Sequence, residues 1–337
     1  MPYHSSTAVS NPSRTHSRRR ITLGAAAALA LASVAAWALA EPAPPAPGGR
    51  SLAQMGKGAF WGIFRAGAHD RIDDALFPLT AAYLQDPTSG ETALLIAHAH
   101  LWRVAERARS PKAQADPRIT DSLVLARHYF QQAARLLPDD RRIDGWLASA
   151  ELALGTVHGN PDDTSKGKQR LIEAWQAYPA FNGFTFGHML SSSPRDSEPF
   201  AMARKAMWST VASCSRGTIT PDAPTAPDTL DLAKAADPAC WNSEKAPHNF
   251  EGFWWSVALI EAKAGNADTA RTCFENARLA PSFASWPYRE PFEADAAGLE
   301  QLIESFAAAE PEAEQRLLVN AAHSCMACHQ ATPNRPR

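Results

Sequence analysis

The chain has 337 residues, of which 45% are hydrophobic and 20% are charged, and its formal net charge at pH 7 is −2. This length allows one large domain or two ordinary ones, and the composition is that of a globular protein. The near balance of charge lacks the strongly basic character typical of nucleic-acid-binding proteins, so we expect no nucleic acid among the partners.

Residues 1–40 have the composition of an export signal. They contain four arginines and no acidic residue, and they end in an apolar run, residues 21–40, that closes with the small-x-small sequence Ala-Leu-Ala. This order predicts a cleaved signal peptide. The apolar run would also span about 30 Å as a helix, enough to cross a bilayer, so an uncleaved N-terminal membrane anchor stays open. We favour cleavage, and in either case expect the rest in the periplasm or on the outer face of the cytoplasmic membrane.

Residues 41–56 begin with a stretch rich in proline and glycine, which predicts an extended linker.

Beyond this linker, a pattern of four positions recurs in the sequence. A small residue is followed four positions later by a large apolar one, three later by alanine, and four or five later by proline. The copies are Ala75, Leu79, Ala82 and Pro87; Ala126, Phe130, Ala133 and Pro138; Gly167, Leu171, Ala174 and Pro179; and Ala270, Phe274, Ala277 and Pro281.

On a helix the first three positions share one face, where small residues let a partner helix approach closely. A proline just past the end stops the helix. The pattern therefore predicts helical hairpins over residues 57–290. It resembles the second helix of a tetratricopeptide repeat (TPR), and Trp254 and Gly265 before the fourth copy match more of that signature. This resemblance implies a concave surface on which a protein partner docks.

The copies are unevenly spaced, with expected insertions at residues 110–121, 155–166 and 216–249, so we expect an irregular array. Pro78 falls inside the helix that carries the first copy of the pattern, and it should kink that helix or shorten its start. Further helices are predicted at 92–107, 199–211 and 299–306, and no alternating stretch predicts a strand. The predicted fold class is all-α. An α-helical domain in which the spacing arose by chance remains the alternative to the TPR resemblance.

Cys214 and Cys240 flank a loop rich in proline, threonine, aspartate and alanine. A disulfide between them is permitted in an oxidising compartment and would contribute about 3 kcal/mol by restricting the unfolded chain. Cys273 lies within the fourth copy and is expected to be a small buried residue. A pairing that involves Cys273 stays open.

The C-terminal region, residues 291–337, holds the sequence Cys-Met-Ala-Cys-His at 325–329. C-x-x-C-H is the spacing that attaches c-type haem, with thioethers to Cys325 and Cys328 and His329 as the proximal iron ligand. A structural zinc site would need a second pair of ligands, and the other cysteines stand alone. The chain is identified as resembling c-type cytochromes, which implies one covalent haem c.

The helix expected at 312–329 resembles the attachment helix of cytochrome c′. Neither methionine nor histidine follows His329, so a sixth iron ligand must come from earlier in the chain. The candidates, each equally explained as an ordinary core or polar residue, are Met189, Met202, Met207, His188 and His248.

These features predict a monohaem cytochrome that carries electrons, with redox partner proteins docking on the helical repeats. A haem-based redox or gas sensor, or a TPR interaction scaffold, is the alternative. A peroxidase-type haem enzyme is less well supported, because the sequence shows no distal acid–base set and no hydrolase or phosphate-loop motif. We predict no catalytic residue.

Overall fold

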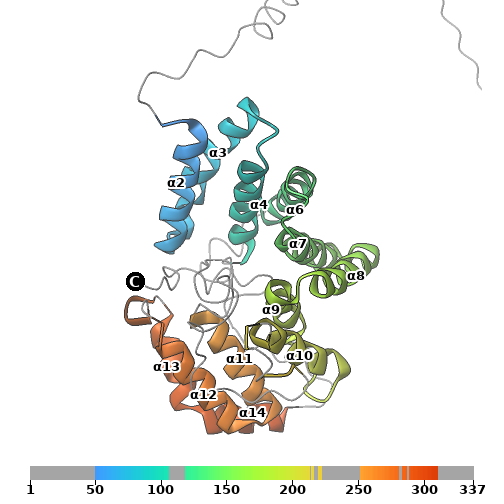
Figure 1. Ribbon diagram of the computed structural model, residues 1–337, viewed down its shortest axis with the longest axis vertical. Helices are drawn as coiled ribbons and strands as arrows, with labels where there is room; N and C mark the ends of the chain where they lie inside the picture. Colours follow the sequence, from blue (N-terminus) through green and yellow to red (C-terminus); the bar gives the residue numbers. More distant parts are fainter. Residues whose placement is uncertain are drawn as a thin grey trace, which may run out of the picture. The chain divides into compact units, whose positions relative to one another are not determined.

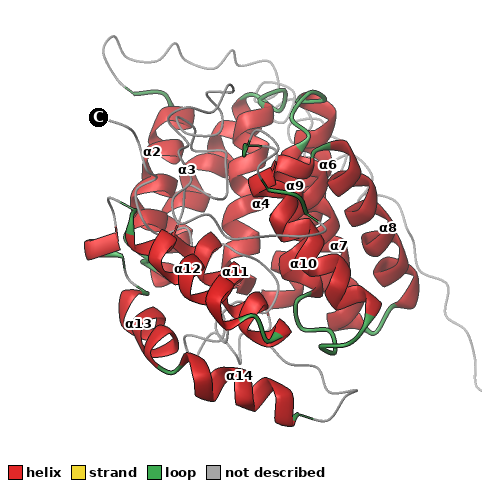
Figure 2. Ribbon diagram, turned by 60° about the horizontal axis from the view of Figure 1, so that its bottom comes forward, coloured by secondary structure: helices red, strands yellow, loops and turns green. Residues whose placement is uncertain are grey.

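The computed structural model describes residues 50–105, 118–212, 214–215, 219–221, 251–280, 283–286 and 288–309, without the side chains of 118–120. The chain divides into a unit of residues 1–49 and a unit that begins at Arg50, and every described element belongs to the second. These residues form helices and no β-strand, which confirms the all-α prediction (Figure 2). The α-helices are α2 (Leu52–Arg65), α3 (Ile72–Gln85), α4 (Gly90–Ala105), α6 (Arg118–Leu136), α7 (Arg142–His158), α8 (Pro161–Ala177), α9 (Pro179–Leu190), α10 (Glu198–Ala212), α11 (Glu251–Ala264), α12 (Ala267–Arg278), α13 (Arg289–Ala297) and α14 (Leu299–Ala308).

Successive helices pack as pairs: α2 with α3, α4 with α6, α7 with α8, α9 with α10, and α11 with α12 (Figure 1). Each pair also contacts the next, through α3 and α4, α6 and α7, α8 and α9, and α10 and α11. Helix α14, which covers the helix predicted at 299–306, packs on α11 and α12.

The recurring sequence pattern marks the second helix of four pairs. Its first three positions lie on α3, α6, α8 and α12 and are all buried, with none of the alanine, leucine or phenylalanine side chains more than 5% exposed. The small first residue allows close approach, because a Cβ added to Gly167 would lie 2.7 Å from the backbone nitrogen of Leu152 on α7. The predicted buried face is therefore confirmed. Pro179 differs from Pro87 and Pro138, since it begins the following helix, α9.

A fifth pair, α9 with α10, carries the same face without the full sequence pattern. Ala203, Met207 and Thr210 have the same spacing on α10 and are completely buried. Threonine replaces the alanine, and no proline follows at the expected distance, so the pattern did not include this helix. Gly187 of α9 lies against it, where an added Cβ would be 2.6 Å from Met207 Cγ.

Several local expectations are corrected by the structure. The expected insertion at 155–166 is a short turn: α7 continues to His158, Gly159 adopts a left-handed φ of 60°, and the Asn160 side chain caps α8. Composition suggested a loop here because the residues that end one helix and begin another are also loop residues. Pro78 does not shorten α3, which begins at Ile72. Helix α2 begins at Leu52, inside the range given to the linker, with a capping box between Ser51 and Gln54.

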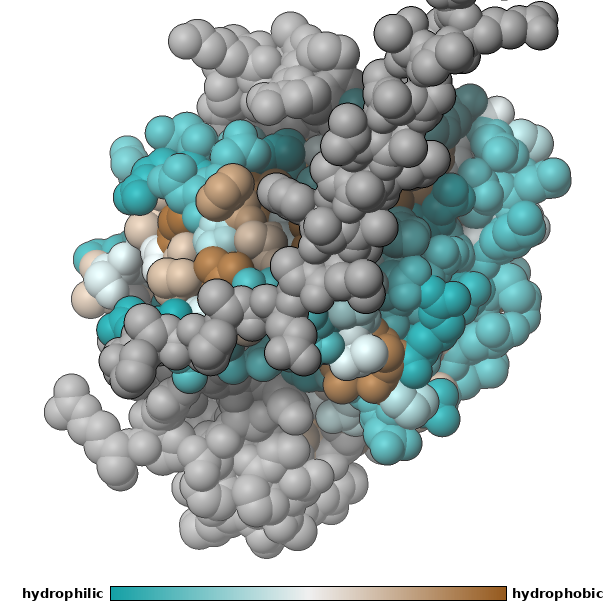
Figure 3. Space-filling model, turned by 90° about the horizontal axis from the view of Figure 1, so that it is seen from above, coloured by the Kyte–Doolittle hydropathy of each residue, from teal (hydrophilic) through white to brown (hydrophobic). Residues whose placement is uncertain are grey.

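The visible surface of the described residues is mostly hydrophilic, with hydrophobic side chains in small groups (Figure 3). The most exposed large apolar residues are Phe77 and Leu84 on α3, at 81% and 78%. None of the helices in the described ranges is long and apolar enough to cross a membrane. Residues 21–40, where an anchor was considered, lie outside those ranges.

Candidate functional site

The predicted haem attachment residues, Cys325, Cys328 and His329, lie outside the described residues, as do His248 and Cys240. Their assignments stay predictions. The structure does place the other candidates for the sixth iron ligand, and it places histidines that the sequence analysis did not select.

The methionine candidates pack in the protein interior. Met207 is completely buried on α10, in a cluster with Trp208 and Phe253. Met189 and Met202 are half-buried and pack on a second cluster, around Leu152 and Phe186. This packing agrees with their interpretation as core residues, since methionine readily fills irregular gaps.

His188 is half-buried near the end of α9. Its ring stacks on Phe184, with 6.0 Å between the ring centroids, and its backbone carbonyl accepts a hydrogen bond of 2.7 Å from the Ser191 hydroxyl. The four described candidates thus all belong to the α9–α10 pair. Their side chains divide between two hydrophobic clusters and an aromatic stack, and form no common site.

Helix α4 carries two buried imidazoles that the sequence analysis missed. His98 and His100 are each 8% exposed, although the helix around them is almost entirely apolar. The His98 ring meets Trp146 edge-on at 4.3 Å and Phe130 at 5.2 Å. The His100 ring lies parallel to Tyr129 at 6.4 Å. The sequence did hold a signal that these histidines are buried: both lie in an otherwise apolar stretch, and a helix that is apolar all round is normally buried on all sides.

His100 is held in its neutral form. Burial lowers its pKa from 6.5 to about 4, and the positive charge of Arg103 acts in the same direction, against the smaller opposing effect of Asp73. Its Nδ1 atom is buried and has no hydrogen-bond partner in the part of the chain that the structure describes. A neutral imidazole with an unbonded nitrogen is the form that binds a metal.

The surroundings of His100 are fixed by contacts between α3, α4 and the turn before α3. Arg103 forms an ion pair with Asp73 of α3. The backbone carbonyl of Arg103 lies 3.2 Å from Nε2 of His69, whose ring meets Trp102 edge-on at 5.9 Å. These contacts fix the end of α4 on which His100 lies.

The buried charges of α11 have a structural use. Glu261 is completely buried, and its carboxylate accepts hydrogen bonds from Arg204 at 2.7 and 3.0 Å, Trp208 at 2.7 Å and Asn266 at 2.7 Å. The buried Lys263 donates to the backbone carbonyls of Ser191 and Ser193, at 2.9 and 2.6 Å. These bonds join α10, α11 and the segment after α9, and they satisfy groups that would otherwise be costly to bury.

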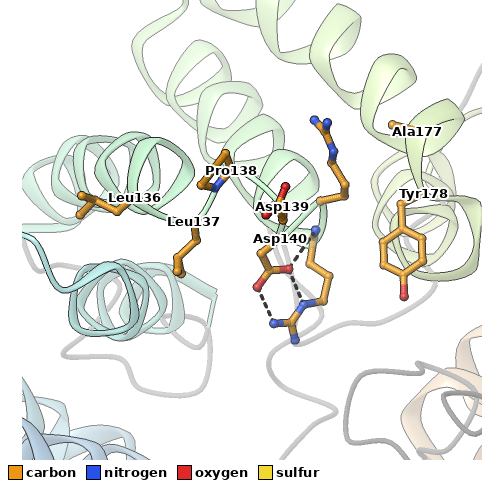
Figure 4. Close-up of a pocket in the computed structure, with 9 residues that line it drawn as sticks. Leu136, Leu137, Pro138, Asp139, Asp140, Ala177 and Tyr178 are labelled. Atoms are coloured by element: carbon orange, nitrogen blue, oxygen red, sulfur yellow. Dashed lines mark hydrogen bonds and ion pairs between the residues drawn. The ribbon is translucent and has the colours of Figure 1, made fainter.

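A cavity of about 640 Å³ lies where the turn between α6 and α7 meets the end of α8 (Figure 4). Asp140 binds Arg142 through both oxygens, and the guanidinium lies 5.4 Å from the centre of the Trp146 ring. Asn182 donates to the carbonyls of Arg141 and Ala174, which ties this turn to α8. The lining residues are Leu136, Leu137, Pro138, Asp139, Asp140, Arg141, Arg142, Ala177 and Tyr178. The cavity thus lies at the junction of the α4–α6 and α7–α8 pairs.

No family model matches the chain. No curated protein and no solved structure matches it either.

Two cysteines fall within the described residues. Cys214 is disulfide-bonded, whereas Cys273 has a free, completely buried thiol whose pKa is raised by burial. The pairing with Cys273 that the sequence left open is therefore excluded, and the pairing of Cys214 with Cys240 stays a prediction. Among the described residues, no three histidine, cysteine or acidic side chains gather as a metal site.

Proposed function

We propose that the chain is an exported monohaem c-type cytochrome that carries electrons. The observation that carries this proposal is the C-x-x-C-H sequence at 325–329, which supplies two thiols and an adjacent imidazole at the spacing that haem attachment needs. The bound haem supplies one-electron redox chemistry. Cys325 and Cys328 hold it covalently, and His329 binds the iron.

The paired helices are proposed to be a TPR-like docking surface for a redox partner. The support is that four pairs carry the small–large–alanine face on their second helix and that a fifth has an equivalent face. Repeats of this kind stack into extended surfaces on which partners bind.

Covalent haem is tested by producing the full chain with a c-type maturation system. We expect the intact protein to gain the mass of one haem and to keep it after denaturation. Cys325→Ser together with Cys328→Ser should abolish this mass, and Cys273→Ser, a matched change of an unrelated cysteine, should leave it. Absence of covalent haem from the wild type would refute the proposal.

The spectrum of the same material separates electron carrier from sensor. A low-spin, six-coordinate reduced haem supports the carrier, whereas a high-spin haem that binds carbon monoxide supports a gas sensor. N-terminal sequencing of the exported protein tests the leader, with cleavage expected at the end of residues 1–40.

A further inference from the structure

Helix α3 presents a second apolar face to solvent, on the side away from its buried residues. The face consists of Phe77, Thr80, Ala81 and Leu84, whose spacing of i, i+3, i+4 and i+7 places them on one side of the helix. Phe77 and Leu84 are 81% and 78% exposed, and the smaller Thr80 and Ala81 lie half-buried between them. A cavity of about 450 Å³ lies among these side chains, and the described residues that line it all belong to α3. Four residues with this spacing form the hole that receives one side chain of a facing helix.

The other helices that carry the recurring pattern differ at the positions equivalent to Phe77, Ala81 and Leu84. The equivalent residues are His128, Gln132 and Arg135 on α6, Gln169, Glu173 and Gln176 on α8, and Thr272, Asn276 and Leu279 in the fourth copy. All but Leu279 are polar, so these helices can face water on this side without a partner. The exposed apolar face of α3 is therefore not a by-product of the pattern, and contiguous apolar groups rimmed by polar residues mark interaction sites.

The ends of this face carry more acidic than basic residues. The acidic residues are Asp70, Asp73 and Asp74 at the start of α3 and Asp86 at its end. Arg71 and Arg103 form ion pairs with Asp74 and Asp73. The side chain of Asp73 is 65% exposed, whereas that of Arg103 is 13% exposed, so the carboxylate faces solvent more than its cation does. The charge around the apolar face therefore complements a partner that is basic.

The area of this face selects one kind of occupant. Phe77 and Leu84 together expose on the order of 300 Å² of side-chain surface, whereas a stable interface buries about 800 Å² on each partner. The face is thus too small for a stable dimer, and a second copy of the chain would bring its own acidic residues to the same site. A single helix with an apolar face and basic flanks matches both the area and the charge.

We propose that Phe77, Thr80, Ala81 and Leu84 form a docking site for an amphipathic helix of a partner protein that carries lysine or arginine beside its apolar face. One apolar side chain of that helix enters the cavity between Phe77 and Leu84, and its cations lie near the acidic ends of the face. The site lies on α3 alone and needs no haem, so it goes beyond the proposed function and does not depend on it.

The test uses a fluorescein-labelled peptide of leucine and lysine, of the same length as α3, with leucines at i, i+3, i+4 and i+7 of each helical repeat. Fluorescence anisotropy measures its binding to the full-length protein, and we expect saturable binding. Phe77→Gln and Leu84→Gln should each weaken it at least about tenfold, because each removes a buried apolar side chain without changing the charge. The matched control is Leu279→Gln, which changes an exposed leucine at the equivalent position of the fourth copy and should leave binding unchanged. A peptide with glutamate in place of lysine should bind at least about tenfold more weakly.

Four results overturn the proposal: no saturable binding of the leucine–lysine peptide, equal binding to Phe77→Gln and the wild type, an equal loss in Leu279→Gln, or equal binding of the glutamate peptide. Sedimentation of the protein alone gives a further check. A wild-type dimer that Phe77→Gln converts to a monomer would assign the face to a second copy and also overturn the proposal. Far-UV circular dichroism checks that the variants fold. Each of these failures leaves the covalent haem intact, and absence of haem leaves the peptide binding intact, so the two proposals fail separately.

Discussion

Helices α11 and α12 form one pair, yet they are built on different principles. All but one residue of α11 is buried, including Glu261 and Lys263, whereas only five residues of α12 are buried and these follow one stripe. The same contrast separates α4, where all but two residues are buried, from α8, where only Gly167, Leu171 and Ala174 are. Among the described residues, the second helices of the pairs therefore carry the pattern that defines the array, and the first helices α7 and α11 carry the buried charged residues Glu151, Glu251, Glu261 and Lys263.

The largest effect is expected when a buried charge is removed from the first helix of a pair. Glu261→Ala leaves Arg204, Trp208 and Asn266 without their shared acceptor, and we expect a loss of about 3–5 kcal/mol in the free energy of unfolding. Denaturant unfolding measures it. The matched control on α12 is Glu275→Ala, whose side chain is 68% exposed. It should change stability by less than about 0.5 kcal/mol. A small loss in Glu261→Ala would mean that the network does not hold the helices together.

A second test addresses the close approach of second helices. In Gly167→Ala the new Cβ meets the backbone of Leu152, which cannot move independently, so we expect a loss of about 1–3 kcal/mol. Gly58→Ala on α2 has open space around it and should instead stabilise the helix by about 0.5–1 kcal/mol. Thermal unfolding of both variants measures these two stability changes. Equal effects of the same sign would show that helix propensity, and not the contact between helices, controls both sites.

The smallest effect is expected at Asp295 of α13, whose carboxylate accepts a hydrogen bond of 2.9 Å from the indole of Trp255 on α11. Burial raises the pKa of this carboxyl above 3.8, against the opposing effect of that bond. The folded state therefore keeps the Asp295 carboxyl protonated to a higher pH than the unfolded state does. The wild type loses stability as the pH rises from the unfolded-state pKa through the raised folded-state pKa. Asp295→Asn keeps an acceptor without the charge.

We expect Asp295→Asn to equal or exceed the wild type at pH 7, within about 1 kcal/mol, and to lack this part of the pH dependence. Unfolding curves between pH 3 and pH 7, at about one-unit steps, check the expectation. A variant clearly less stable than the wild type at pH 7 would show that the charge itself is stabilising.

The same contrast explains how much the sequence could predict. Ala126, Phe130 and Ala133 lie on a helix with one buried face, so their periodicity stands out against polar neighbours. Thr210 broke the pattern on α10, because threonine fills the alanine position while its hydroxyl bonds the carbonyl of Met207, at 2.7 Å. Residues 155–166 looked like a loop because a turn and a helix cap use the same residue types.

The buried polar residues were harder to predict. For His98 and His100 the sequence offered one signal, that the helix around them is almost entirely apolar, and no periodic pattern that marks a site. The bonds of Glu261 join residues up to 57 positions apart, and no short pattern encodes them. The C-x-x-C-H motif, in contrast, is contiguous and could be recognised directly.

The free thiol of Cys273 gives the last helix pair a built-in probe. Its side chain is completely buried on α12, and burial raises its pKa, so a thiol reagent in solution cannot react with it while α11 and α12 remain together. The rate at which Cys273 is labelled therefore reports how often this pair opens. Slow labelling would identify α11 and α12 as a unit that opens only rarely, and a partner bound there would slow it further.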